Sequence, residues 1–211
     1  TDFSTPEAVV RKKPTNIRIL FSGRLESQKN PIAALRIFKT ALHESGTNDI
    51  SLTVIGMGSM EGSMKRYVLE NNLRNHVTFV SDTSKRKILA AMRTHDILLQ
   101  PSVSEGISIM AIEAMNRGMI PLTFDVGGQK ELVRDLVCQS EESMSARILE
   151  LRACTTNEYD QLQSKIKEYV TPFLPLHFEK SLLQVVNNVA HSRASLPDNI
   201  DLKLSELTRS L

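Results

Sequence analysis

Two cations, Arg24 and Lys29, stand where they could bind a diphosphate. Arg24 follows the apolar, β-rich run 17–21, and Lys29 precedes an amphipathic stretch that Asn30 can cap. An arginine binds phosphate oxygens in pairs, a lysine binds them as a point charge, and the first turn of a helix favours anions. This combination favours a diphosphate site, and two solvated surface cations are the alternative interpretation.

Two carboxylates lie eight residues apart in the segment 102–115. Glu105 lies at the mouth of a turn, and Glu113 lies inside the apolar run 109–115. A buried carboxylate is costly unless it accepts hydrogen bonds, and vicinal sugar hydroxyls can supply them. On a continuous helix the two residues would be about 12 Å apart and would face broadly the same side. We expect a sugar near Glu105 and a ribose near Glu113, with a salt bridge to a neighbouring helix as the alternative for Glu113.

Glycines gather after the β-rich runs. Six of the nine are in such places, namely Gly23, Gly56, Gly58, Gly106, Gly127 and Gly128. The carboxyl ends of strands bind ligands in open α/β sheets, and glycine lets backbone N–H groups approach a ligand closely. A single glycine is also common in an ordinary tight turn, but six at one edge of a sheet favour a ligand site.

The elements that must position these residues alternate in type. Short apolar runs are typical of strands covered on both faces, and the amphipathic stretches between them are typical of helices. The expected strands are 17–21, 51–55, 77–80, 96–100 and 120–124, and the expected helices are 31–43, 61–72, 85–93 and 107–117. This alternation predicts an α/β fold with an open, doubly wound parallel sheet.

Beyond residue 131 the pattern is nearly all helical. Helices are expected at 142–151, 157–170 and 176–191, with a weakly indicated sixth strand near 136–138. Gly118 is expected to follow the end of the helix 107–117. The expected organisation is a linker from a missing N-terminal domain at 1–14, a Rossmann-like domain at 15–170, a terminal crossover helix at 171–194 and a tail at 195–211.

Composition excludes several other classes of protein. The net charge of +2 over 211 residues gives no case for nucleic-acid binding. No apolar run approaches the roughly 20 residues that span a bilayer, and residues 1–14 lack the apolar core of a signal peptide. Cys138 and Cys154 have no metal or redox spacing, so we expect two reduced cysteines in a reducing compartment. The absence of an Asp-x-Asp pair or ligand cluster predicts that no metal is bound.

Taken together, the motifs resemble the C-terminal, nucleotide-sugar-binding domain of the retaining GT-B glycosyltransferases, the glycosyltransferase group 1 family. The matching motifs are Gly23-Arg24 with Lys29, Gly56-Met57-Gly58, the E-x7-E signature of Glu105-Gly106 with Glu113-Ala114-Met115, then Gly118, and Gly127-Gly128 with Glu131. The resemblance covers residues 17–137. The stretch 132–138 departs from the family pattern, because it is compressed and lacks the usual glycine.

The resemblance implies roles for these residues. Arg24 and Lys29 would neutralise the leaving diphosphate, Glu105 would contact the donor sugar and Glu113 would bind the ribose. Backbone N–H groups after Gly106 would hold the distal phosphate. The base would lie near Val80 and Ser81, and the rest of the implied binding set is Gly23, Gly56, Gly58, Ser102, Ile107, Ser108 and Ile109.

The resemblance also implies a hexosyltransferase-type enzyme that uses a UDP- or GDP-sugar, retains the anomeric configuration, needs no metal or other cofactor and serves polysaccharide biosynthesis. Its acceptor site would lie in the N-terminal domain, so this chain alone would not transfer sugar. The expected location is the cytoplasm, with peripheral association with the inner membrane face through the other half left open. A nucleotide-sugar 2-epimerase of the same fold and a non-catalytic binding or regulatory domain stay open as alternatives. A Rossmann NAD domain is disfavoured, because residues 23–26 are not GxGxxG.

Overall fold

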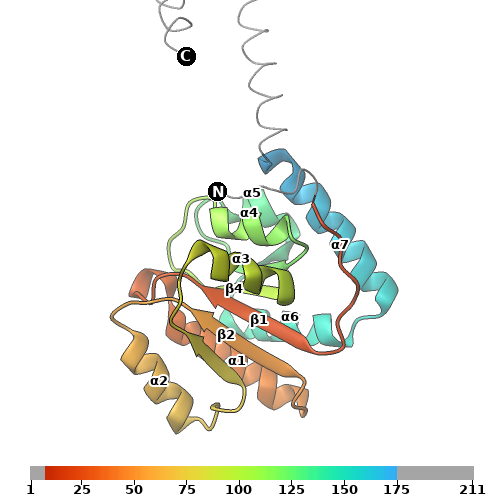
Figure 1. Cartoon of the computed structure of the whole chain (residues 1–211). Helices are drawn as coiled ribbons and strands as arrows, with labels where there is room; N and C mark the ends of the chain where they lie inside the picture. Colours follow the sequence, from red (N-terminus) through yellow and green to blue (C-terminus); the bar gives the residue numbers. More distant parts are fainter. Residues whose placement is uncertain (1–7, 175–211) are drawn as a thin grey trace, which may run out of the picture. The chain divides into compact units, whose positions relative to one another are not determined.

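The computed structural model describes residues 8–174, whose core is a parallel sheet (Figure 1). Its six strands have the order β3-β2-β1-β4-β5-β6, and every neighbouring pair is parallel. The strands are β1 (Ile17–Ser22), β2 (Ile50–Ile55), β3 (Val77–Val80), β4 (Ile97–Gln100), β5 (Ile120–Phe124) and β6 (Val137–Cys138). The predicted doubly wound α/β sheet is confirmed, and the weakly indicated sixth strand is present.

Helices alternate with the strands and then follow them. They are α1 (Pro31–Ser45), α2 (Glu61–Glu70), α3 (Lys85–Thr94), α4 (Ile109–Met115), α5 (Gln129–Val133), α6 (Glu141–Ala153) and α7 (Thr156–Val170). Three short 3-10 turns are η1 (Ser27–Lys29), η2 (Arg134–Leu136) and η3 (Thr171–Phe173). The expected helix 176–191 and the tail 195–211 lie outside the described residues.

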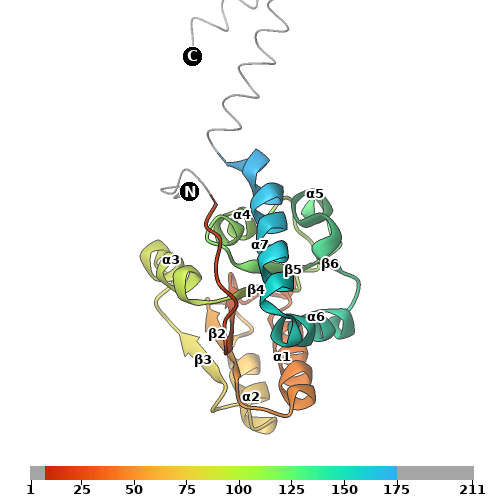
Figure 2. The same cartoon turned by 90° about the vertical axis from the view of Figure 1, so that its right-hand side faces the viewer.

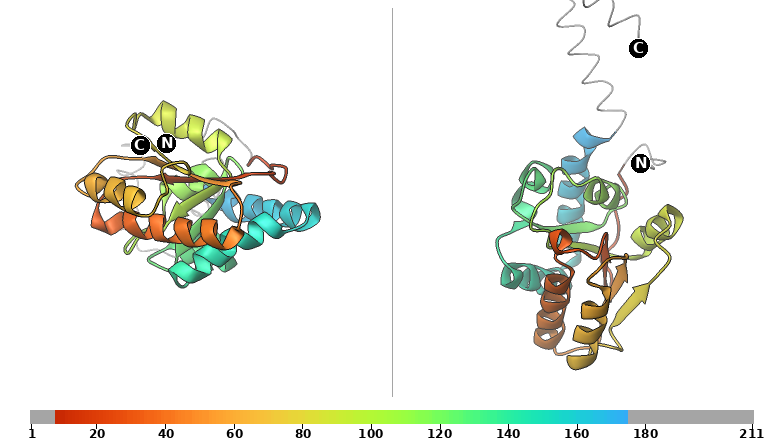
Figure 3. Two further views of the ribbon diagram at one scale, coloured as in Figure 1. Left: turned by 90° about the horizontal axis from the view of Figure 1, so that it is seen from below. Right: turned by 90° about the vertical axis from the view of Figure 1, so that its left-hand side faces the viewer.

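The strand order reverses direction at β1. Strands β2 and β3 extend the sheet on one side of β1, whereas β4, β5 and β6 extend it on the other side. Because parallel crossovers are right-handed, this reversal puts the crossover helices of the two halves on opposite faces. Figure 3 shows α1 and α2 on one face of the sheet and α3 on the other. The loops after β1 and β4 therefore meet at a switch point, where sheets of this kind bind ligands.

The middle of the sheet is buried on both faces. Ile97, Leu98 and Leu99 of β4 are fully buried, as are Ile19 and Leu20 of β1. Parallel strands that are covered by helices on both sides read as continuous apolar runs, which is why the sequence predicted them well. This packed centre leaves the carboxyl ends of the strands as the place for polar side chains.

The start of α1 corrects one prediction. Pro31 occupies the first turn, as expected, but the side chain of Asn30 makes no capping hydrogen bond. Asn30 has a left-handed backbone with a φ of 49°, because the chain leaves the 3-10 turn η1 directly before the helix begins. Asn30 therefore shapes the turn with its backbone, and residues with short polar side chains tolerate that conformation.

Helix α4 is shorter than the predicted 107–117 at both ends, because it runs from Ile109 to Met115. It begins at Ile109, after Ser108 caps it by accepting a hydrogen bond from Ala111 N at 3.2 Å. At the other end Gly118 has a φ of 74°, and the N–H groups of Gly118 and Met119 donate back to carbonyls of the last turn. A left-handed glycine of this kind closes many helices.

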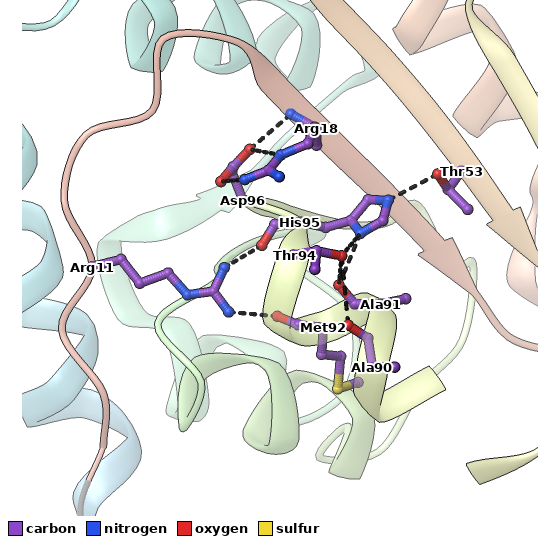
Figure 4. A network of polar contacts seen from close by, with 9 residues as sticks. All are labelled: Arg11, Arg18, Thr53, Ala90, Ala91, Met92, Thr94, His95 and Asp96. Atoms are coloured by element: carbon purple, nitrogen blue, oxygen red, sulfur yellow. Dashed lines mark hydrogen bonds and ion pairs between the residues drawn. The ribbon is translucent and has the colours of Figure 1, made fainter. Parts of the chain in front are cut away.

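The segment 8–14 packs on the domain, although the sequence placed it in a linker. Ala8 is buried, and Arg11 N donates to Gln163 Oε1 of α7 at 3.1 Å. Figure 4 shows the guanidinium of Arg11 donating to the carbonyl oxygens of Met92 and His95, at the end of α3. A cation there also complements the negative end of the helix. In Figure 2 the same segment runs between α3 and α7.

Candidate functional site

The loop after β1 is fixed to the loop after β2 by several hydrogen bonds. Leu25 N donates to Met57 O at 2.9 Å, and Met60 N donates to Leu25 O at 2.9 Å. The carboxylate of Glu26 accepts from Ser59 N at 2.7 Å and from Ser59 Oγ at 2.6 Å. These bonds, with the hydroxyl bond the larger cause, hold the pKa of Glu26 below its ordinary value. Glu26 thus serves the architecture of the loop.

Gly56 has a structural role within this loop pair. A Cβ atom at Gly56 would lie 2.0 Å from Gly23 O, and one at Gly58 would lie 2.5 Å from Leu25 O. Glycine is needed here because two loops approach each other closely. Contact of Gly23, Gly56 and Gly58 with a ligand remains a prediction.

The loop after β1 is also tied to the loop after β4. Val103 N donates to Gln28 O at 3.0 Å, and Gln28 Nε2 donates to Ser104 O at 3.2 Å. The same glutamine accepts from Arg24 Nη2 through Oε1 at 3.2 Å. Gln28 therefore orients the guanidinium of Arg24 while it holds the segment that carries Glu105.

Lys29 and Glu105 meet directly in an ion pair between Nζ and Oε2. Their side chains are 19% and 17% exposed, so the pair is largely shielded from water. The sequence assigned them to phosphate and sugar separately. The structure instead places them side by side, close enough for one ligand to contact both, while Arg24 remains exposed.

The segment after β5, which includes the first residue of α5, contacts the turn that carries Glu105 and Gly106. Gln129 Nε2 donates to Gly106 O at 2.8 Å. Gly127 has a φ of 56°, and a Cβ atom there would lie 1.6 Å from Glu105 O. The glycine pair Gly127-Gly128 is thus explained by close contact between loops, and its contact with a ligand remains a prediction.

Buried polar side chains cluster at the carboxyl ends of the central strands. Ser22 ends β1, Gln100 ends β4, and Thr123 lies near the end of β5; all three are buried. Gln100 exchanges hydrogen bonds with Ser108 at 3.1 and 3.2 Å, and Ser102 is buried as well. Buried polar groups in proteins nearly always have a hydrogen-bond partner or a functional role. Their position here is typical of the floor of a site.

A cavity of about 170 Å³ opens beside this floor. Its lining residues are Ser22, Gly23, Arg24, Ile55, Gly56, Met57, Thr83, Ile88 and Met110. Sites for small molecules usually measure about 300–1,000 Å³, so this cavity has the size of one part of a nucleotide site. Strand β3 ends at Val80 and Ser81 follows it; neither lines the cavity, whereas Thr83, two residues after Ser81, does.

The predicted geometry of the two carboxylates is wrong. Because α4 begins at Ile109, Glu105 lies in the preceding loop, and no continuous helix joins it to Glu113. Glu113 is buried on α4, and Arg117 Nη1 donates to its backbone oxygen at 2.9 Å. Met110 is the α4 residue that lines the cavity. Ribose binding by Glu113 therefore remains a prediction.

Ile107 and Ile109 remain at the surface beside the turn. Their exposed fractions are 41% and 58%. The sequence analysis missed Gln28 and Gln129, the two side chains that fix this turn. Their positions, directly before Lys29 and directly after the glycine pair, are the only signal that could have indicated them.

Three further observations concern metal ions, membranes and the cysteines. Within residues 8–174 no three His, Cys, Asp or Glu side chains gather closely enough to hold a metal ion. None of the described helices is long and apolar enough to cross a bilayer. Cys138 and Cys154 are both free thiols, which agrees with the expectation of two reduced cysteines.

Known proteins resemble this chain in sequence and in fold. A D-inositol 3-phosphate glycosyltransferase of Paenarthrobacter aurescens is 23% identical over 125 residues, which are 58% of this chain and 31% of that protein. The chain thus spans about a third of the length of this relative.

Two solved structures share the fold. The C-terminal domain of a glycosyl transferase group 1 family protein from Francisella tularensis has a TM-score of 0.65 at 16% identity, over 84% of this chain and 98% of that one. The pneumococcal O-GlcNAc transferase GtfA, solved with UDP and GlcNAc, has a TM-score of 0.65 at 14% identity, over 85% of this chain and 38% of that one.

The family model described as glycosyl transferases group 1 matches residues 3–170. That match covers the whole sheet and the helices up to α7. The chain therefore belongs to the glycosyl transferases group 1 family and forms a GT-B domain of it.

Proposed function

We propose that this domain binds the nucleoside-diphosphate sugar that a retaining glycosyltransferase uses as its donor. The observation that carries the proposal is the Lys29–Glu105 ion pair at the switch point of the sheet, with Arg24 held in the same loop by Gln28. Support also comes from the structural neighbour GtfA, whose structure contains UDP and GlcNAc.

The chemistry of the donor fits these charges. When the bond between the anomeric carbon and the distal phosphate oxygen breaks, its electron pair stays on the diphosphate. Arg24 and Lys29 would neutralise that charge, and fixed charges of this kind need no reorganisation during the reaction. The acceptor oxygen forms the new bond, and its proton passes to the leaving phosphate oxygen. Glu105, beside Lys29, would bind hydroxyl groups of the sugar.

Two finer features belong to the same proposal. The cations Arg24 and Lys29 would replace a divalent metal on the diphosphate, so binding would persist in a chelator. Glu113 would accept hydrogen bonds from the ribose hydroxyls, so ribonucleotides would bind more tightly than 2′-deoxyribonucleotides. Both expectations can be measured with the same binding assay.

Calorimetric titration with UDP and GDP tests the proposal. Charge-assisted hydrogen bonds are worth about 1.5–3 kcal/mol, so Arg24→Ala should weaken binding of the preferred nucleotide by roughly tenfold or more. Arg66→Ala is the matched control, because Arg66 is an exposed arginine in the middle of α2. Equal affinity of the Arg24→Ala and Arg66→Ala variants, both folded, would remove Arg24 from the site.

A further inference from the structure

We propose that Gln28 and Gln129 act together as positioning residues that hold the turn 104–107 in the geometry needed to bind a phosphate. The inference rests on the proposed function, because it concerns the turn that would hold the distal phosphate. We name this pair the glutamine clamp. The two side chains come from different segments: Gln28 lies in the 3-10 turn η1 after β1, and Gln129 is the first residue of α5 after β5.

The clamp acts on the two carbonyl groups that flank Glu105. Gln28 Nε2 donates to Ser104 O at 3.2 Å, and Gln129 Nε2 donates to Gly106 O at 2.8 Å. Both peptide planes are therefore fixed by a side-chain amide. Val103 N adds a third bond, to Gln28 O at 3.0 Å, so the backbone of the clamp is tied to the same segment.

Because the peptide group is planar, these hydrogen bonds also fix the direction of the neighbouring N–H groups. In a trans peptide the carbonyl and the following N–H point in opposite directions. When Ser104 O and Gly106 O face the glutamines, the N–H groups of Glu105 and Ile107 face away from them. Among the described residues, neither of these two N–H groups donates a hydrogen bond. Two fixed, available donors, one of them on the residue whose side chain pairs with Lys29, suit the oxygens of a phosphate.

Gln129 is not explained by stability. Its side chain is 1% exposed, and its Oε1 has no hydrogen-bond partner among residues 8–174. A buried acceptor without a partner is unfavourable, and Gly106 is exposed, so water can replace the lost donor when an apolar side chain of similar shape takes the place of Gln129. A polar residue at this position is therefore better explained by its hold on Gly106 O.

Gln28 has a second bond that must be separated from the clamp. Its Oε1 accepts from Arg24 Nη2 at 3.2 Å, so loss of Gln28 would also release Arg24. Gln28→Glu keeps an acceptor for Arg24 but cannot donate to Ser104 O. Gln28→Glu also adds a negative charge, which lowers the affinity for any phosphate, so the order parameters measured without ligand are its readout of the clamp, whereas Gln28→Met removes both contacts.

The test combines two measurements on the 211-residue chain. The variants are Gln28→Glu, Gln129→Met and the double variant, with Gln161→Met, at an exposed position of α7, as the control. Nitrogen-15 relaxation reports the order parameters of the amides of residues 105–107 without any ligand. Calorimetry then compares UDP and GDP with uridine and guanosine, which lack phosphate.

The clamp predicts a specific pattern. The order parameters of these amides should fall from about 0.85 to about 0.6 or lower in the double variant. In Gln129→Met, which adds no charge, affinity for the preferred nucleoside diphosphate should fall roughly five- to tenfold, the effect of one or two lost hydrogen bonds. Affinity for the nucleoside and the melting temperature of Gln129→Met should stay at the values of the control.

Other results overturn the clamp or the proposed function separately. Unchanged order parameters in the double variant would overturn the clamp, as would equal losses for nucleoside and nucleoside diphosphate. A wild-type chain that binds neither UDP nor GDP would contradict the proposed function, and the order parameters would then decide the clamp by themselves.

Discussion

Lys29 and Glu105 form an ion pair that joins the loop after β1 to the loop after β4, and both side chains are more than four-fifths buried. The pair places a negative charge next to a cation that we assign to the diphosphate. An arriving phosphate and the Glu105 carboxylate would therefore compete for Lys29. The pair also keeps the two loops together before a donor binds.

The competition makes a prediction for Glu105→Gln. Removal of the negative charge should strengthen binding of UDP or GDP without a sugar by about fivefold, which corresponds to about 1 kcal/mol for a partly shielded ion pair. Binding of the complete nucleotide sugar should weaken, because a sugar contact is lost. Calorimetry on both ligands measures the two effects, with Lys29→Met expected to weaken both. Unchanged affinity for the sugar-free nucleotide would show that the pair does not compete.

Replacement by alanine should affect the stability of the protein very differently at Gly106 and at Gly127. Gly127 has a φ of 56°, and its Cβ would strike Glu105 O, so Gly127→Ala should lower the free energy of unfolding by more than about 2 kcal/mol. No heavy atom lies within 4 Å of a Cβ at Gly106, so Gly106→Ala should change stability by less than about 0.5 kcal/mol. Urea titrations measure both.

The same two alanine variants distinguish an effect on ligand binding from an effect on folding. If a phosphate approaches the backbone at Gly106, Gly106→Ala should weaken binding of the nucleoside diphosphate while the protein stays fully folded. A Gly106→Ala variant with wild-type affinity would place the ligand elsewhere. A stable Gly127→Ala variant would contradict the close contact between the loops after β4 and β5.

Much of the fold followed from the sequence, because parallel strands buried on both faces appear as separate apolar runs. The strand 77–80 matched the structure at both ends, and 120–124 did so as well. The start of α4 was wrong because Ile107 is apolar and continues the helical pattern, although the helix begins only after the cap at Ser108. Apolarity alone does not show where a cap will form.

The candidate site was harder to predict than the fold. Arg24, Lys29 and Glu105 were indicated by their charge and by their place after strands; the structure pairs Lys29 with Glu105 and binds Arg24 to Gln28 in the same loop. Gln28 and Gln129 carried no such signal, because their role depends on which loops become neighbours at the carboxyl edge of the sheet. That neighbourhood follows from the order of the strands, which the sequence did not show.

The backbone conformation at Arg134 allows backbone strain to be measured. The stretch 132–138 contains no glycine, yet Arg134 has a φ of 50° and a ψ of −112°. Its guanidinium lies 4.4 Å from the centre of the Tyr169 ring and pairs with Glu168 at 3.0 Å. These contacts hold a conformation that costs an ordinary residue about 1–3 kcal/mol.

Comparison of glycine with alanine isolates that cost. Both Arg134→Gly and Arg134→Ala remove the side-chain contacts, but only glycine relieves the strain. Arg134→Gly should therefore unfold at a higher urea concentration, with an advantage of about 1 kcal/mol. At Arg66, inside α2, the order should be reversed, since glycine is worse than alanine in a helix by about 1 kcal/mol. The same order at both positions would show that Arg134 is unstrained.

His95 predicts how stability depends on pH. Its ring lies between Ala91 O and Thr53 Oγ1, each at 2.8 Å, with Arg11, Arg18 and Asp96 close by (Figure 4). Burial is the largest cause that lowers its pKa below 6.5, although the bond to Ala91 O opposes it.

A histidine whose pKa is lower in the folded protein resists protonation there, so acid favours the unfolded chain. Its contribution to stability is complete above the unfolded pKa of 6.5 and is lost as the pH falls towards the lower folded pKa. Urea titrations between about pH 7.5 and 5 should show this loss. His95→Gln should flatten the curve, and His43→Gln, at an exposed position of α1, should leave it unchanged. A wild-type curve that is flat in this window would contradict the prediction.

The last prediction is that the 211-residue chain binds donor nucleotide but does not transfer sugar by itself. Every residue that we assign to the donor, from Arg24 to Glu113, lies in the single parallel sheet domain, and the chain covers 31% of its relative from Paenarthrobacter aurescens. Transfer requires an acceptor oxygen held close to the anomeric carbon, and such positioning can supply about 7–11 kcal/mol of the barrier. It also requires a site closed to water. The cavity beside Arg24 has the size of only one part of a nucleotide site, so it cannot enclose the donor and the acceptor together. Measurable nucleotide binding with turnover at background level is therefore expected, and activity should appear only when the remaining part of a full-length relative is joined to the chain. Sugar transfer by the purified chain at about 1 per second or faster, an ordinary rate for an enzyme, would show that this domain contains a complete active site.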